Sequence, residues 1–253
     1  MVEYSPEKAG VTSSILVPST TAHLASAEEA RRERAEGMKA FIYQGGWDGH
    51  TPRETSALMA ADLEKEGVKV TIEDHLKTLL DKERLATFDL IVPFWTMSPP
   101  DQITHEMVGN LSEAVKAGAG LAGVHGGMGD SVRHSHSYLW MTGGQFLDHP
   151  FTGDYVVRVV DHGHPATAPM PKAFRYKSEQ YYMAVDPAIK VLAVTDYAFQ
   201  GEIVEMPVIW HRLWGKGRVF YSALGHVHQE FLDFPAVRDM TLRGMMWAIR
   251  RKG

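Results

Sequence analysis

Short apolar runs and longer amphipathic segments alternate between residues 38 and 124, and this alternation constrains the fold more than any other feature of the sequence. A short apolar run is typical of a buried strand, whereas a longer amphipathic segment is typical of a helix. Strand and helix in strict alternation predict a parallel sheet with right-handed crossovers. The expected strands are 39–44, 68–73, 90–94 and 120–124, and the expected helices are 51–66 and 101–117.

The remaining sequence extends this sheet and adds a separate N-terminal segment. Residues 155–160, 189–195, 207–210 and 218–222 read as further strands, 215–217 as a hairpin turn and 235–250 as a closing helix. Residues 176–182 lie between two of these strand-like stretches. We expect one domain over 38–253 with a doubly wound, mostly parallel, flavodoxin-like α/β sheet. Residues 1–37 are expected to form an arm that packs on the domain or on a neighbouring subunit, with a loose tail as the alternative.

Composition excludes several classes of protein. The 253 residues contain no cysteine, which removes disulfides, thiolate metal ligands and a cysteine nucleophile. The net charge of −5 argues against a nucleic-acid surface. No apolar run is long enough to span a membrane, and the N-terminus lacks the features of a signal peptide. We expect a cytoplasmic protein with no nucleic-acid or membrane partner.

The segment 119–127 ends an apolar run in a histidine, His125, which two glycines follow directly. This is the pattern of a strand-to-helix elbow, where a tight turn exposes one side chain at the carboxyl end of a parallel sheet. A serine hydrolase of this architecture would carry Gly-x-Ser-x-Gly at the elbow, which this chain lacks. The chemistry of His125 is therefore the central question that the sequence raises.

Two more histidines lie just beyond predicted strands, each next to a glycine: His50 in Gly49-His50 and His226 in Gly225-His226. Ligands bind beyond the carboxyl ends of the strands in open parallel sheets. A single histidine at a strand end is most often a structural hydrogen-bonding group. Three at the same edge of one sheet indicate that at least two of them line one site.

Glu179, within Tyr176-Lys177-Ser178-Glu179-Gln180-Tyr181-Tyr182, is the expected acidic partner. A carboxylate among aromatic rings can act as an acid or base, can ligate a metal, or can simply be exposed. Histidine with carboxylate is the ligand set for zinc or another divalent ion. The sequence nevertheless contains no compact motif such as His-Glu-x-x-His.

Aromatic residues at predicted strand ends add a possible ligand surface. Trp47, Trp95 and Trp210 suit either stacking on a sugar ring or buried packing. His211, which follows Trp210, is expected to line the site from above. The other histidines read as turn or loop residues, among them His134, His136, His149, His162, His164 and His228. Neither a Gly-x-Gly-x-x-Gly nor a Walker-type sequence is present, so no nucleotide is expected.

Together, these residues resemble the ThuA-like, or trehalose-utilisation, family over roughly residues 38–250. The resemblance is carried by motifs in a fixed order: 46–50, Gly118 to Gly127, His164-Pro165, Glu179-Gln180-Tyr181, 207–210, 215–221 and Gly225-His226. It implies a fold like that of the class I glutamine amidotransferases. In those enzymes a cysteine occupies the elbow and a catalytic histidine follows a late strand, positions that match His125 and His226 here. The missing cysteine contradicts amidotransferase activity, and the resemblance implies a role in disaccharide catabolism, on trehalose-type or 3-keto sugars.

The first hypothesis is therefore an enzyme acting on a small sugar substrate. The expected catalytic residues are His125, Glu179 and His226; the expected metal ligands are His50, His125 and His226; and the expected substrate-binding residues are Trp47, His50, Tyr181, Trp210 and His211. A divalent metal, zinc or manganese, is the cofactor considered, with a metal-free histidine base as the alternative. A homo-oligomer is expected. The competing hypotheses are a non-catalytic sugar-binding or regulatory protein on an amidotransferase-like scaffold, and a structural subunit of a partner dehydrogenase.

Overall fold

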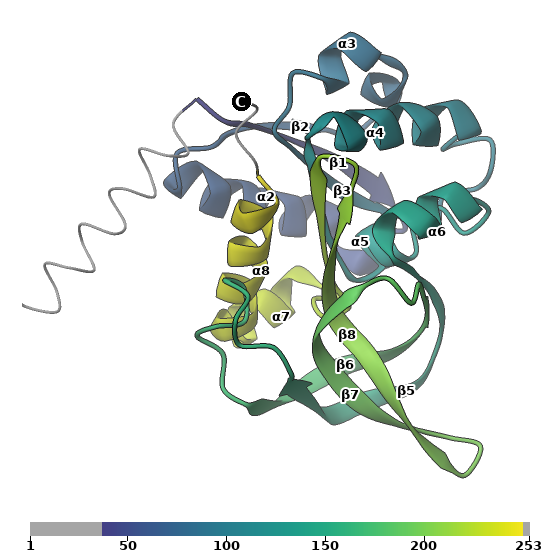
Figure 1. Cartoon of the computed structure of the whole chain (residues 1–253), viewed down its shortest axis with the longest axis vertical. Helices are drawn as coiled ribbons and strands as arrows, with labels where there is room; N and C mark the ends of the chain where they lie inside the picture. Colours follow the sequence, from purple (N-terminus) through teal and green to yellow (C-terminus); the bar gives the residue numbers. More distant parts are fainter. Residues whose placement is uncertain (1–36, 250–253) are drawn as a thin grey trace, which may run out of the picture.

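The computed structural model describes residues 37–249, which form one α/β domain around a nine-stranded sheet (Figure 1). The predicted arm, 1–37, lies outside the described residues except for Gly37. The strands are β1 Lys39–Gly46, β2 Lys69–Glu73, β3 Leu90–Thr96, β4 Gly120–Val124, β5 Gly144–Val159, β6 Ala173–Val185, β7 Lys190–Phe199, β8 Glu202–Trp214 and β9 Gly217–Ser222. The helices are α2 Pro52–Lys65, α3 Lys82–Leu85, α4 His105–Ala117, α5 His125–Gly129, α6 His136–Thr142, α7 His228–Asp233 and α8 Pro235–Ala248, with 3₁₀ turns η1 Asp48–His50 and η2 Lys77–Leu80.

The sheet has the order β2-β1-β3-β4-β9-β8-β7-β5-β6 and consists of two halves. The pairs from β2 to β9 are parallel, as the alternating sequence predicts. The pairs from β9 to β6 are antiparallel, so the described sheet is mixed. In Figure 1 the antiparallel strands β5, β6 and β7 lie in the lower part of the molecule, away from α3 and α4.

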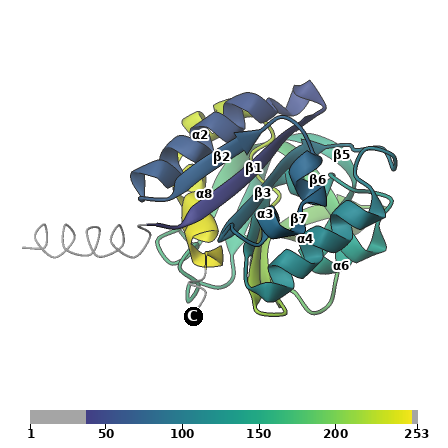
Figure 2. The same ribbon diagram turned by 90° about the horizontal axis from the view of Figure 1, so that it is seen from above.

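Helices cover both faces of the parallel half. Helix α2 packs on β1, β2 and β3 and contacts α8, which packs on β4 and β9. Helices α4 and α6 contact each other and β9, and Figure 2 shows them together on the opposite side of β1 and β3 from α2. Strand β3 lies between these layers with all seven of its residues buried, which explains its uninterrupted apolar sequence. Because the helices cover the faces of the sheet, a site can form beyond the carboxyl ends of β1, β4 and β9.

The structure corrects the sequence-based prediction at several elements. Residues 176–182 are not a connection but part of β6, which pairs with β5 along most of its length. Strand β8 continues to Trp214, so Trp210 and His211 lie inside the strand and not at its end. His149 lies within β5, in the register shift between Asp148 and Phe151, where the sequence predicts a turn. Helix α2 begins at Pro52, one residue after the predicted start, and the side chain of Thr51 caps no helical N–H.

Candidate metal centre

His125 stands at a strained elbow, as its flanking glycines predict. Its φ of 43° lies in the left-handed region that residues with a Cβ rarely adopt. The side chain is 1% exposed, and Nδ1 lies 2.8 Å from the carbonyl oxygen of Ala223. A carbonyl oxygen only accepts hydrogen bonds, so Nδ1 carries a proton and Nε2 is left with its lone pair when the ring is neutral. The elbow thus holds one imidazole with Nε2 directed into the site.

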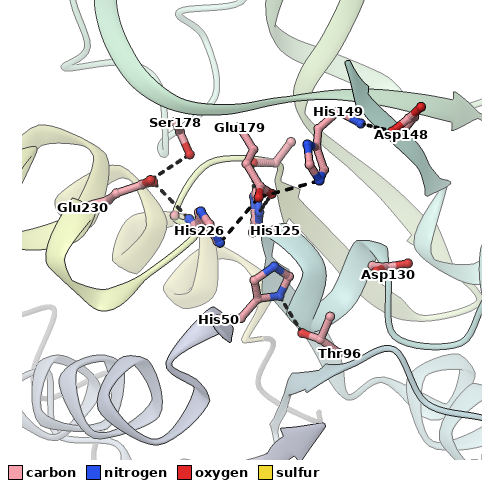
Figure 3. A network of polar contacts seen from close by, with 12 residues as sticks. His50, Thr96, His125, Asp130, Asp148, His149, Ser178, Glu179, His226 and Glu230 are labelled. Carbon is pink, nitrogen blue, oxygen red and sulfur yellow. Dashed lines mark hydrogen bonds and ion pairs between the residues drawn. The ribbon is translucent and has the colours of Figure 1, made fainter. Parts of the chain in front are cut away.

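Three further chain segments bring titratable side chains to the same point (Figure 3). His50 ends the turn η1 that follows β1, and its Nδ1 lies 2.9 Å from Thr96 Oγ1 at the end of β3. His226 follows β9, and Glu179 comes from the middle of β6. His50 can lie this close to the elbow because Gly126 has no side chain. A Cβ at Gly126 would lie 2.3 Å from Cε1 of His50.

The four side chains form one cluster, which we call the His/Glu cluster: His50, His125, Glu179 and His226. One nitrogen or oxygen atom from each lies within 4.8 Å of the others. His125 Nε2 is 3.2 Å from Glu179 Oε2, and His226 Nε2 is 3.7 Å from Glu179 Oε1. The three imidazole rings are mutually about equidistant, with centroids 5.0 to 5.1 Å apart.

Burial and mutual charge shift the protonation of the cluster. Burial, reinforced by the neighbouring imidazoles, lowers the pKa of His50 to about 3, and the same causes lower the pKa of His226. Burial raises the pKa of Glu179, but the contact with His125 and the charges of three histidines outweigh it and hold that pKa at about 2. At neutral pH His50 and His226 are therefore neutral, and Glu179 is a carboxylate.

This donor set fits a divalent metal ion. His226 Nε2 is buried without a hydrogen-bond partner among residues 37–249. With Nδ1–H committed to Ala223, His125 Nε2 can approach the carboxylate of Glu179 only as an imidazolium or with a cation between them. Neutral imidazoles with one carboxylate are ligands of zinc and similar ions. Nδ1 of His125 bonds the carbonyl of Ala223, and Nδ1 of His50 bonds Thr96 Oγ1. These hydrogen bonds fix the orientation of the two rings, as in known metal sites.

The space at the cluster is small. A cavity of about 10 Å³ is lined by His50, His125 and His226 together with apolar residues such as Phe94 and Val124. This is room for one water molecule or one ion, not for a sugar. A substrate would therefore lie outside this cavity, against the side chains at its mouth.

Two of the other predicted site residues border the cluster. The Trp47 ring is half exposed, with its centroid 4.9 Å from that of His50 in an edge-on arrangement. Tyr181 is buried and stacks on His125 at 3.9 Å between centroids.

Trp210 and His211 are not brought to the cluster. Trp210 is fully buried, and its Nε1 donates to the carbonyl of Thr142. The neighbouring His211 packs on Trp247 and His164. Residues inside a strand alternate between the two faces of the sheet, so these two neighbours point in opposite directions.

Besides Thr96, sequence reasoning missed His149 and Glu230, whose side chains also contact members of the cluster. His149 Nε2 lies 3.7 Å from Glu179 Oε1, on the outer side of the carboxylate, and the His149 side chain is 42% exposed. Glu230 on α7 accepts a hydrogen bond from the backbone N–H of His226. The shift in register of β5 that directs His149 leaves no periodic signal in the sequence, and Glu230 reads as an ordinary polar helix residue.

The fold and the cluster together define the class: an α/β protein with a three-histidine, one-carboxylate centre at the carboxyl edge of its parallel strands. The sequence matches the model of the ThuA, or trehalose-utilisation, family over residues 39–248. The chain belongs to this family, as its motifs predict. No curated protein compared with the chain matches it significantly.

Solved structures show the same fold at low sequence identity. A ThuA-like protein from Bacteroides uniformis ATCC 8492 is 20% identical with a TM-score of 0.68, covering 87% of this chain and 94% of that one. A ThuA-like protein from Parabacteroides merdae ATCC 43184 is 19% identical with a TM-score of 0.65, covering 84% and 90%. A cytoplasmic protein from Salmonella typhimurium LT2 is 14% identical with a TM-score of 0.60, covering 85% and 100%. These likenesses confirm the predicted single α/β domain.

Among residues 37–249, no helix has the length and apolar character needed to cross a membrane.

Proposed function

We propose that this protein is a metal-dependent enzyme of disaccharide catabolism, acting on a trehalose-type or 3-keto sugar. The family supplies the connection with trehalose utilisation. The single observation that supports a metal is the convergence of four ligand atoms within 4.8 Å at the His/Glu cluster.

The protonation of the cluster favours metal binding over metal-free base catalysis. A general base works best when its pKa lies near the working pH. The pKa of His50 is about 3 and that of His226 is also lowered, so both are weak proton acceptors at neutral pH. Neutral rings are, however, the form that ligates metal ions, since no proton must leave first.

In the proposed reaction, the chain's own residues bind and orient the sugar. A divalent ion held by His50, His125, Glu179 and His226 would act as a Lewis acid on a hydroxyl or keto oxygen. Trp47, half exposed beside His50, offers a ring face on which a sugar can stack. Tyr181 stacks on the His125 ring and restricts its rotation.

The alternative is a non-catalytic sugar-binding or regulatory protein. The observation that favours it is that the cavity lined by the three histidines, about 10 Å³, has no room for a sugar. A protein of this kind would bind the same sugars through Trp47 without converting them.

Metal analysis and turnover separate these proposals. The protein purified without chelator should contain close to one equivalent of zinc, manganese or a similar ion, and should convert members of a panel of disaccharides and their 3-keto forms. Chelator should abolish this turnover, and the metal should restore it. If no metal co-purifies and neither metal nor chelator changes turnover, the metal proposal is wrong. If every sugar binds and none is converted, the non-catalytic alternative is correct.

A further inference from the structure

The turn between β9 and α7 carries His226, and a side chain from α7, that of Glu230, reaches back to it. Gly225 has a φ of 91°, which lets the chain reverse sharply before His226. Glu230, on α7, reaches back so that its Oε2 accepts from the backbone N–H of His226 at 3.0 Å. The position of His226 therefore depends on where the carboxylate of Glu230 is held.

That carboxylate is held by β6, the strand that carries Glu179 (Figure 3). Ser178 Oγ donates to Glu230 Oε1 at 2.7 Å, and Tyr176 Oη donates to Glu230 Oε2 at 2.6 Å. The same Tyr176 oxygen accepts from Gly225 N at 3.0 Å. Because Ser178 is the chain neighbour of Glu179, the Glu230 carboxylate links the backbone of His226 to the residue next to Glu179.

A second contact joins the same turn to the segment of His50. The backbone N–H of His228 donates to Thr51 Oγ1 at 2.9 Å. Thr51 follows His50 directly, and its hydroxyl also lies 3.4 Å from Thr55 Oγ1 on α2, so it sits between α2 and α7. The 225–230 turn is thus tied to two of the three other segments that contribute to the cluster.

We propose that Glu230 is a positioning residue that sets the distance between His226 and Glu179 and thereby the metal affinity of the cluster. This inference rests on the metal proposed above. Groups that orient metal ligands without touching the ion alter affinity by about 10- to 100-fold when removed, because the freed ligands must be ordered again on binding. Glu230 acts here through the main chain of His226 and through Ser178, not through the ion.

The test is a titration of the metal-free full chain with cobalt(II), followed by the visible absorption of the bound ion. Glu230→Ala should weaken cobalt binding about 10- to 100-fold and change the shape of the spectrum. Glu230→Gln should bind within a few-fold of the unaltered chain. Its amide oxygen can accept from His226 N and Tyr176 Oη, while its amide N–H donates to Ser178 Oγ.

Two more variants make the result specific. Asp233→Asn removes a charge from the same helix, but Asp233 is exposed and, within 37–249, its carboxylate hydrogen-bonds only Gln229 on α7, so cobalt binding should not change. Ser178→Ala removes one of the two β6 hydrogen bonds to Glu230 and leaves that of Tyr176, so it should give a smaller loss than Glu230→Ala. Should Glu230→Ala fail to fold, the Ser178→Ala and Glu230→Gln variants decide the question by the same titration.

The outcomes separate this inference from the proposed function. If the unaltered chain binds no cobalt, the metal proposal fails. If it binds cobalt and both Glu230→Ala and Ser178→Ala bind equally well, the metal proposal stands and the positioning role of Glu230 is wrong. The role is also wrong if Glu230→Ala and Glu230→Gln lose affinity equally, in parallel with the melting temperature of the metal-free protein.

Discussion

His125 combines a costly backbone conformation with a side chain directed into the site. A residue with a Cβ held at a φ of 43° is less stable there than glycine by about 1–2 kcal/mol. The surrounding contacts, Tyr221 Oη to the carbonyl of His125 and Nδ1 to Ala223, hold it in place. Such strain marks functional positions, because folding alone would favour glycine.

Two substitutions at this position separate backbone strain from chemistry. His125→Ala and His125→Gly should both abolish metal binding and activity, since each removes the same ligand. His125→Gly should be the more stable of the two by about 1 kcal/mol, because only it relieves the positive φ. Urea unfolding of the metal-free variants measures the difference. Equal stability, or a large fall in stability in both, would instead give His125 a mainly structural role.

The lowered pKa of His50 predicts a specific dependence of stability on pH. The ordinary pKa of histidine, 6.5, applies to the unfolded chain, whereas the folded pKa is about 3. Between these values the unfolded state binds more protons, so the free energy of unfolding falls as the pH drops. The slope from one such group is at most about 1.4 kcal/mol per pH unit.

Urea unfolding with chelator at pH 7, 6 and 5 tests this dependence. The unaltered chain should lose stability over this range, and His50→Asn should lose clearly less. His226 contributes in the same direction, so some slope should remain in the variant. An identical slope in both proteins would contradict the assignment of the lowered pKa to His50.

At the scale of elements, the sequence predicts the parallel half well and the antiparallel half poorly. The strands β1, β3 and β4 are buried on both faces, so their apolar runs are distinct, and glycines mark the ends of β1 and β4. In β6 the buried positions alternate through Tyr176, Ser178 and Gln180 but change phase at Tyr181, because one face meets α7 and the other meets the elbow. Glu179 was therefore identified as a candidate by its neighbours, while its strand was missed.

The site residues on the parallel half are likewise predicted better than those on the antiparallel half. His50, His125 and His226 were predicted together because the carboxyl ends of parallel strands meet at one edge. The contribution of β6 depends on how the antiparallel half folds back over that edge, which no local pattern reports. The role predicted for Trp210 was based on an assumed strand end at a residue that lies inside β8.

Trp210 is expected to support the packing of α6 on β8. Its indole is fully buried and donates to the carbonyl of Thr142, the last residue of α6. Trp210→Phe should lower the free energy of unfolding by about 1–3 kcal/mol, since it leaves that carbonyl unpaired and a space unfilled. Metal affinity should not change. Urea unfolding measures the stability of the variant, and cobalt titration measures its metal affinity. A loss of sugar binding at unchanged stability would instead support a direct contact between Trp210 and the sugar.

For the whole molecule, the His/Glu cluster joins distant parts of the chain. Its members lie at positions 50, 125, 179 and 226, in both halves of the sheet. An ion that binds only the folded state stabilises it by about 2.7 kcal/mol at a hundredfold excess over Kd. For a domain of this size, the melting temperature should then rise by about 5–11 °C.

Thermal unfolding with zinc and with chelator tests this stabilisation. The increase should be reversed by chelator and absent from His226→Ala, which lacks one ligand. An equal increase in that variant would show that the ion binds elsewhere. No increase in the unaltered chain would contradict a metal centre made by the folded state.

The central position of β9 has a consequence for how the molecule is made. Strand β9 lies between β4 and β8, and it is the strand that joins the parallel half to the antiparallel half. A chain still being synthesised, with β9 not yet formed, presents two separate sheets with open edges. His226 follows β9 directly, so the last member of the cluster arrives with the strand that closes the sheet. A nascent or truncated chain therefore cannot assemble the complete centre, and metal loading becomes a step that only a finished domain can perform.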